Sequence, residues 1–289
     1  MKHPFFPLFL AFALLGFTAC DDDDNNGIDD AVPGTFEVEF ENVFGPQDNQ
    51  RAFRLDAVGA TDYPFTNGVG QDYNVTFLRY YISEVVLEGP NGERFEDPMS
   101  VSAVDAKGYY LIDAADPESL TFDLEDVPAG RYDKISFLLG VDSTGVLEGA
   151  AGGDLDPATS GMFWNWNAGY VALKIEGQSP ASPGGARGNS IEPGNEAGIV
   201  FHLGGWKDIA GSPFVYNNQR VELDFDTNAR VGTGLSPTAH LELDVNALFD
   251  GPEATVDFAT GNVNVHRPTD GAAMAKNAAA AFRYDHVHQ

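Results

Sequence analysis

The sequence predicts an all-β fold, an antiparallel β-sandwich with long loops and one C-terminal helix. Two observations predict it. Most of the chain consists of short apolar or alternating segments that Gly, Pro, Asp and Asn residues separate. Only one segment has the composition and period of a helix. Many short strands joined by turns are typical of an antiparallel sandwich.

The strands are predicted from period-two patterns. In residues 35–44, aromatic and aliphatic residues alternate with glutamates, as in a half-buried strand. Residues 73–87 are rich in β-branched and aromatic residues, and the sequence Gly-Pro-Asn-Gly at 89–92 turns the chain back. We expect further strands at 109–112, 120–124, 132–141, 171–176, 199–203, 221–225, 240–245 and 255–258.

The predicted helix covers residues 269–282. Thr269 or Asp270 can cap its N-terminus, and the segment is rich in alanine. Met274, Ala278 and Phe282 recur every four residues, so they share one face. We expect this face to dock on the sheet.

Residues 1–19 have the pattern of a bacterial secretion signal. Lys2 precedes an apolar stretch at 5–17, which is short for a membrane span, and small residues lead to Cys20. The residues that lead to Cys20 resemble a lipobox, a motif in which the cysteine thiol is acylated and the chain is cleaved just before the cysteine. An ordinary signal peptide with an incidental cysteine is the alternative. We expect Cys20 to carry the lipid.

Residues 20–34 predict an acidic flexible tether, because the run Asp21–Asp24 offers charge and nothing to bury. Residues 35–289 then form one domain, with a long surface loop at 178–198. Acidic residues just after the lipidated cysteine resemble a surface-export signal of Gram-negative bacteria. We therefore expect an outer-membrane lipoprotein on the cell surface or the periplasmic face.

Composition and the absence of certain motifs limit the classes of function and of partner that fit this sequence. The sequence has 16 basic and 44 acidic residues, a net charge of −28, which repels nucleic acid and anionic lipid surfaces. It contains no GxSxG elbow, HExxH pair or phosphate-binding loop, so we expect a binding protein and not an enzyme. Cys20 is the single cysteine, so a metal site in the domain would need His, Met, carboxylates or a modified ring.

Three histidines are candidate metal ligands. His202 lies in an apolar strand that ends in two glycines, where a hydrogen-bonded core residue is the alternative. His286 and His288 are two residues apart, so in an extended segment they project to one side and can chelate a metal. A solvated C-terminal tail is the alternative for this pair.

Two other histidines are expected to have no such role. The strand at 240–245 buries its leucines, which predicts that His240 and Glu242 face solvent. His266, two residues before a proline, is expected to be a loop residue.

The run Gly161–Tyr170 concentrates rare side chains. It holds two of the three tryptophans, Trp164 and Trp166, and one of the four methionines, Met162, all on one face of an extended segment. The pattern fits an aromatic piece of core or a site at which soft, oxidisable side chains gather.

The order of several motifs resembles the MbnP-like copper-binding family, which includes methanobactin-associated proteins and MopE-like surface lipoproteins. The resemblance extends from about residue 35 to the C-terminus. It rests on the aromatic run above and on the segments Leu78–Ser83, Val127–Tyr132, Ile135–Phe137, Leu173–Gly177, Phe201–Gly205 and Asp285–His288.

The resemblance implies a copper site. In this family a tryptophan is oxidised to kynurenine by a dihaem, peroxidase-like (MbnH-like) partner, and the new amine helps histidines to hold Cu(I). Phe163 and Asn165 stand where some members have histidine. Carried onto this chain, the resemblance gives Trp164, then Trp166, as the modified residue, with His202, then His286 and His288, as ligands and Met162 as a soft neighbour.

The sequence therefore predicts a lipid-anchored protein for copper acquisition or handling. The alternative is a structural or interaction lipoprotein of the same fold without a metal site. A third hypothesis, a glycan-binding surface protein, requires Trp206 or Tyr170 to be an exposed stacking platform.

Overall fold

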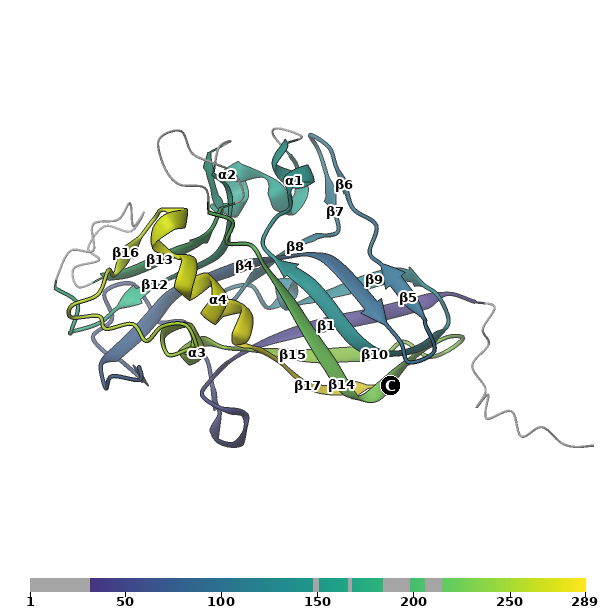
Figure 1. The fold of residues 1–289 in the computed structure, drawn as a ribbon, viewed down its shortest axis with the longest axis horizontal. Helices are drawn as coiled ribbons and strands as arrows, with labels where there is room; N and C mark the ends of the chain where they lie inside the picture. The colour runs from purple at the N-terminus through teal and green to yellow at the C-terminus, as the bar shows by residue number, and fades with distance from the viewer. Residues whose placement is uncertain (1–31, 148–150, 166–167, 184–197, 206–214) are drawn as a thin grey trace, which may run out of the picture.

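The computed structural model describes residues 32–147, 151–165, 168–183, 198–205 and 215–289. Two sheets stack with a common apolar core between them. In Figure 1, β1, β15 and β17 of one sheet lie below β4 of the other. The predicted all-β sandwich with a C-terminal helix is confirmed. Cys20, Trp166, Trp206 and most of the predicted loop at 178–198 lie outside the described residues.

The small sheet has five strands in the order β17-β15-β1-β2, with β9 also paired to β1. Its N-terminal strand pairs in parallel with β15, whereas β17 is antiparallel to β15. The strands are β1 (Gly34–Phe44), β2 (Arg51–Ala52), β9 (Thr121–Val127), β15 (Thr238–Asp244) and β17 (Phe282–His288).

The large sheet has ten strands with the main order β14-β10-β4-β12-β13-β16. Its longest strand, β4, pairs with β10 and β12 and with three short strands. The strands are β3 (Phe65–Thr66), β4 (Asp72–Glu88), β5 (Arg94–Glu96), β8 (Tyr109–Asp113), β10 (Gly130–Leu139), β11 (Phe163–Asn165), β12 (Gly169–Gln178), β13 (Gly198–Gly204), β14 (Gln219–Val231) and β16 (Asn264–Val265).

The remaining elements are short. A separate hairpin joins β6 (Ser100–Val101) to β7 (Ala106–Lys107), and single-turn 3₁₀ segments occur at Gln47–Asn49, Pro117–Leu120, Gly153–Leu155 and Pro268–Asp270. In the described part of the chain, no helix has the length and apolar character that crossing a membrane requires. The helices are α1 (Ser143–Leu147), α2 (Pro157–Ser160), α3 (Val245–Phe249) and α4 (Ala272–Ala280).

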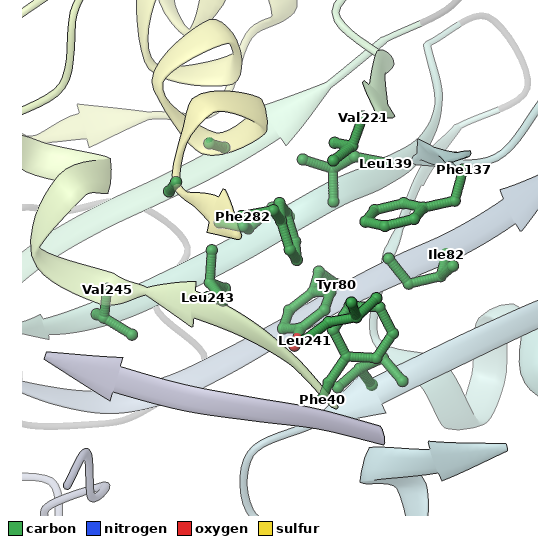
Figure 2. Close-up of a cluster of buried hydrophobic side chains, with 14 of the residues drawn as sticks. Phe40, Tyr80, Ile82, Phe137, Leu139, Val221, Leu241, Leu243, Val245 and Phe282 are labelled. Carbon is green, nitrogen blue, oxygen red and sulfur yellow. The ribbon is translucent and has the colours of Figure 1, made fainter. Parts of the chain in front are cut away.

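The core between the sheets is aromatic at its centre (Figure 2). The ring of Phe40 lies 5.9 Å from that of Tyr80, 5.7 Å from Phe137 and 6.0 Å from Phe282, so four strands meet there. These edge-to-face contacts are the favourable arrangement for aromatic pairs. The predicted docking face of the helix is also confirmed, because Met274 and Ala278 of α4 are buried in this core. Phe282 reaches the core from β17 instead.

Two sequence predictions need correction. Residues 255–258 form no strand, because the Asp257 carboxylate accepts hydrogen bonds from Ala259 and Thr260 and closes a turn. Two of the strand pairs, β1 with β15 and β13 with β16, are parallel. Of the two alternatives for the C-terminal segment, the extended one is observed, because this segment is a strand paired along β15.

We predict that Phe40→Ala destabilises the protein by about 3–5 kcal/mol, because it leaves a cavity where three other rings meet. Urea unfolding followed by tryptophan fluorescence measures the change. Val104→Ala is the control, since Val104 is 86% exposed and its loss should be close to neutral. Equal stability of the two variants would contradict the core as described.

Candidate metal centre

Two neighbouring strands place His202 on the side of the large sheet that faces away from the core. Leu173, Ile175 and Phe201 point into the core, so the side chains that alternate with them point outward. Lys174 of β12 is the direct cross-strand partner of His202 in β13. Strand periodicity therefore gathers polar side chains on this outer face.

His202 belongs to a buried charged triad with Glu176 and Lys174. The His202 Nε2 atom lies 2.7 Å from Glu176 Oε1, and the Lys174 ammonium lies 3.5 Å from the same oxygen. Their side chains are only 10%, 5% and 3% exposed. Burial of such charges is tolerated when each is paired, as here.

Contacts within the triad determine the protonation states of Glu176 and His202. Burial alone would raise the pKa of Glu176, but the hydrogen bond from His202 and the charge of Lys174 lower it, so the carboxylate is ionised. Burial lowers the pKa of His202, and Lys174 adds to this effect while Glu176 opposes it. A neutral His202 must use its Nε2–H to donate to Glu176. Its Nδ1 atom then carries a lone pair.

A second histidine faces this lone pair. β16 pairs in parallel with β13, Val265 beside Phe201, so the next residues, His266 and His202, lie side by side. Their Nδ1 atoms are 3.1 Å apart. His266 was expected to be a loop residue without a role, and the structure corrects this. The signal that sequence reasoning missed is the strand pairing, which joins segments 64 residues apart.

A glycine allows the segment after His266 to approach β13. Gly205 has φ of +107°, and a Cβ there would lie 2.6 Å from Pro268 Cγ. The nearby amide of Asn217 also donates to the carbonyls of Gly204 and Pro268. The two glycines after His202 are therefore needed for close packing beside the histidine pair.

The histidine pair fits a metal ion. A metal that binds imidazole nitrogens at about 2.0–2.1 Å requires the two nitrogens to be within about 4.2 Å. The 3.1 Å separation meets this condition. Glu176 behind His202 corresponds to the carboxylate that commonly orients a metal-binding imidazole. His266 Nε2 is buried without a hydrogen-bond partner in the described part of the chain.

The aromatic run lies on the same side of the large sheet, but farther along it. Trp164 is half-buried and packs with the fully buried Met162 in a second apolar cluster around Tyr81. Phe163 pairs with Tyr170, and four residues of strand, about 13 Å, separate Tyr170 from Lys174. The structure therefore does not bring Trp164 or Met162 into contact with His202.

A row of two cationic side chains and one aromatic ring connects the histidine pair to the aromatic run. The Phe77 ring lies between the Lys174 ammonium, at 4.5 Å, and the Arg79 guanidinium, at 4.8 Å. Arg79 also donates to the Ser160 carbonyl, next to the aromatic run. The indole Nε1 of Trp164 is buried and has no hydrogen-bond partner among the described residues. An unpaired buried donor is costly, and this indole shares that feature with a few other buried polar groups, among them His240 Nε2 and His266 Nε2.

His286 and His288 lie in the small sheet, apart from His202. They join His240, and one ligand nitrogen from each residue lies within 4.8 Å of the others. His240 and Glu242 point away from the core, as the alternation predicts, but they are less exposed than expected. The His240 side chain is 22% exposed, and Glu242 is buried under Arg283, to which it is ion-paired.

The glycan hypothesis finds no support at Tyr170. Its side chain is buried, and its hydroxyl donates to the Leu155 carbonyl at 2.6 Å. A sugar-stacking platform requires an exposed ring face, which this tyrosine does not offer.

We predict that the metal-free protein loses stability as the pH falls from about 6.5 to about 4. Burial, with the charge of His202, lowers the pKa of folded His266 to about 4, whereas the unfolded side chain takes up its proton near pH 6.5. Between these values the unfolded state binds more protons and is favoured. Urea unfolding at pH 7, 6 and 5 measures the slope. His266→Gln should have a shallower slope, and equal slopes would refute this origin.

Comparison with known proteins agrees with the fold and with the sequence resemblance. The structure matches that of MbnP from Methylosinus trichosporium with a TM-score of 0.50 and 18% identity, over 83% of this chain and 86% of that chain. No curated protein sequence matches. The family model for MbnP matches residues 33–267. Since this match includes most of the chain, the protein is a member of the MbnP family.

Proposed function

We propose that this protein handles copper and holds Cu(I) between His202 and His266. The observation that carries the proposal is the pair of Nδ1 atoms 3.1 Å apart, with Glu176 fixed behind His202. Membership of the MbnP family supports the choice of copper.

The surroundings favour the monovalent ion. Cu(I) accepts neutral imidazoles and a low coordination number, and the domain has no cysteine to compete as a ligand. The buried ammonium of Lys174, 3.5 Å from Glu176, places a positive charge beside the histidine pair. This charge offsets that of the ionised Glu176, so the place has no net negative charge to attract a divalent ion.

The proposal includes oxidation of Trp164 to kynurenine. A dihaem, peroxidase-like partner would use two molecules of hydrogen peroxide to cleave the indole C2–C3 bond, adding two oxygen atoms and releasing two waters. Hydrolysis of the resulting formamide then releases formate and leaves an aromatic amine. The buried Nε1 of Trp164, without a hydrogen-bond partner in the described structure, supports this residue. The change would give a nitrogen ligand at Trp164, which lies apart from the histidine pair and so outside the Cu(I) site proposed at His202 and His266.

The proposal also places the protein on the outer membrane, attached through lipid on Cys20. The lipobox-like residues before Cys20 and the acidic run after it support this location. In the described residues the first strand begins at Gly34, so the acidic residues between it and Cys20 would hold the domain away from the bilayer.

We predict that His202→Gln and His266→Gln each weaken Cu(I) binding by at least about tenfold, because each removes one of two ligands. Glu176→Gln should weaken binding by about 10–100-fold through loss of the carboxylate that orients His202. Competition with a chromophoric Cu(I) chelator under anaerobic conditions measures the affinity.

Glu118→Gln is the control, because it changes an exposed side chain outside the histidine pair and outside the three histidines of the small sheet. It should leave Cu(I) affinity unchanged. Thermal melting separates loss of metal from loss of folding. If properly folded His266→Gln binds Cu(I) as tightly as the parent, the histidine pair is not the site.

Mass spectrometry of the protein isolated from its native membrane tests the modifications. Kynurenine should add about 4 Da to the peptide that contains Trp164, and acyl chains should be found on Cys20. Trp164→Phe should remove the 4 Da change and leave the acylation. An unmodified Trp164 peptide from copper-loaded native protein would exclude the kynurenine step, and an unacylated N-terminus would exclude the anchor.

A further inference from the structure

A β-bulge near the C-terminus turns two histidines away from the core. His240 of β15 pairs with His286 of β17, but the next residue, Leu241, pairs with Tyr284, so Asp285 is the extra residue. Phe282 and Tyr284 contact the core, and beyond the bulge Val287 does so. Without the extra residue, the alternation would direct His286 and His288 inward.

The bulge therefore places three imidazoles on the outer face of the small sheet. The His240 and His286 rings are parallel, with centroids 4.2 Å apart. The His288 ring lies 5.0 Å from that of His240 and 4.8 Å from that of His286. The sequence has six histidines, and the five that follow His3 all belong either to this cluster or to the pair in the large sheet.

Carboxylates orient two of the three rings. His286 Nδ1 lies 2.7 Å from an oxygen of Asp285, whose other oxygen accepts from Gln47. His240 Nδ1 lies 3.4 Å from Glu39, the residue beside it on β1. Each carboxylate favours a proton on Nδ1 and leaves the lone pair on Nε2. His240 Nε2 is buried and has no hydrogen-bond partner in the described residues.

We infer that His240, His286 and His288 form a second metal site, for a divalent late first-row transition ion. Ligand nitrogens within 4.8 Å of one another need to close by up to about 1.2 Å to surround one ion at about 2.0–2.1 Å. The His286 side chain is 45% exposed and His288 is exposed, so rotation of these side chains can supply the movement.

The ligand set and the charge determine the class of ion. Three neutral imidazoles suit Cu²⁺, Ni²⁺ and Zn²⁺, and Cu²⁺ binds such sets most tightly. Glu39 and Asp285 bring negative charge to the cluster, whereas beside the histidine pair Lys174 offsets the charge of Glu176. The two proposed sites therefore differ in the ion that they prefer. The histidine pair prefers Cu(I), and the three-histidine cluster prefers a divalent ion.

The test uses the full domain with the first site removed. In the double variant His202→Gln/His266→Gln, Cu²⁺ alone should still bind with a stoichiometry of one, measured by calorimetry. The electron paramagnetic resonance spectrum of this complex should show coupling to imidazole nitrogen. Adding His240→Gln, His286→Gln or His288→Gln should each weaken Cu²⁺ binding by at least about tenfold.

Two further variants control for non-specific attraction of the ion and for loss of folding. Glu118→Gln removes an exposed negative charge on another element and should leave the affinity unchanged, which excludes general attraction of the acidic surface. His288→Gln changes an exposed side chain, so its melting temperature should equal that of the double variant. If the double variant binds no Cu²⁺, or if folded His288→Gln binds it as before, the second site is refuted. Neither result would affect Cu(I) binding at the histidine pair.

Discussion

Burial of one face of each strand in the core between the two sheets is the constraint on which the rest of the structure depends. Side chains alternate along a strand, so the residues that enter the core determine which residues point away from it. Leu173 and Ile175 point inward, and Lys174 and Glu176 therefore point outward. In β15, the buried Leu241 likewise turns the neighbouring His240 to the outer face. The core thus positions both groups of histidines without contacting a metal.

The two outer faces differ in electrostatics, and this difference gives them different chemistry. The pair in the large sheet is almost completely buried on the His202 side. Burial and the charge of Lys174 lower the pKa of His202 and keep it neutral, and the hydrogen bond to the ionised Glu176 leaves the lone pair on Nδ1. The three histidines of the small sheet are more exposed and have carboxylates beside them. Under the two proposals, a chain without cysteine in its domain would distinguish a monovalent from a divalent ion through the charges behind the imidazoles.

Much of the fold was predictable from the sequence, because period-two patterns and turn residues are local signals. They locate β1 and β4 to within a residue or two, and the alanine-rich composition locates α4. The sites were less predictable because they depend on pairing between distant segments. His266 meets His202 through a parallel pair with β16, and His240 meets His286 across β15 and β17. The bulge at Asp285 interrupts the alternation, so the pattern alone gives the wrong face beyond it.

The central claim is that His202 and His266 hold copper. Anomalous diffraction at the copper edge, from crystals of protein loaded with one equivalent of Cu(I), tests it most directly. We expect one anomalous peak between the two Nδ1 atoms, at about 2.0–2.1 Å from each. A copper peak elsewhere, with His202 and His266 still in contact with each other and without metal, would contradict it.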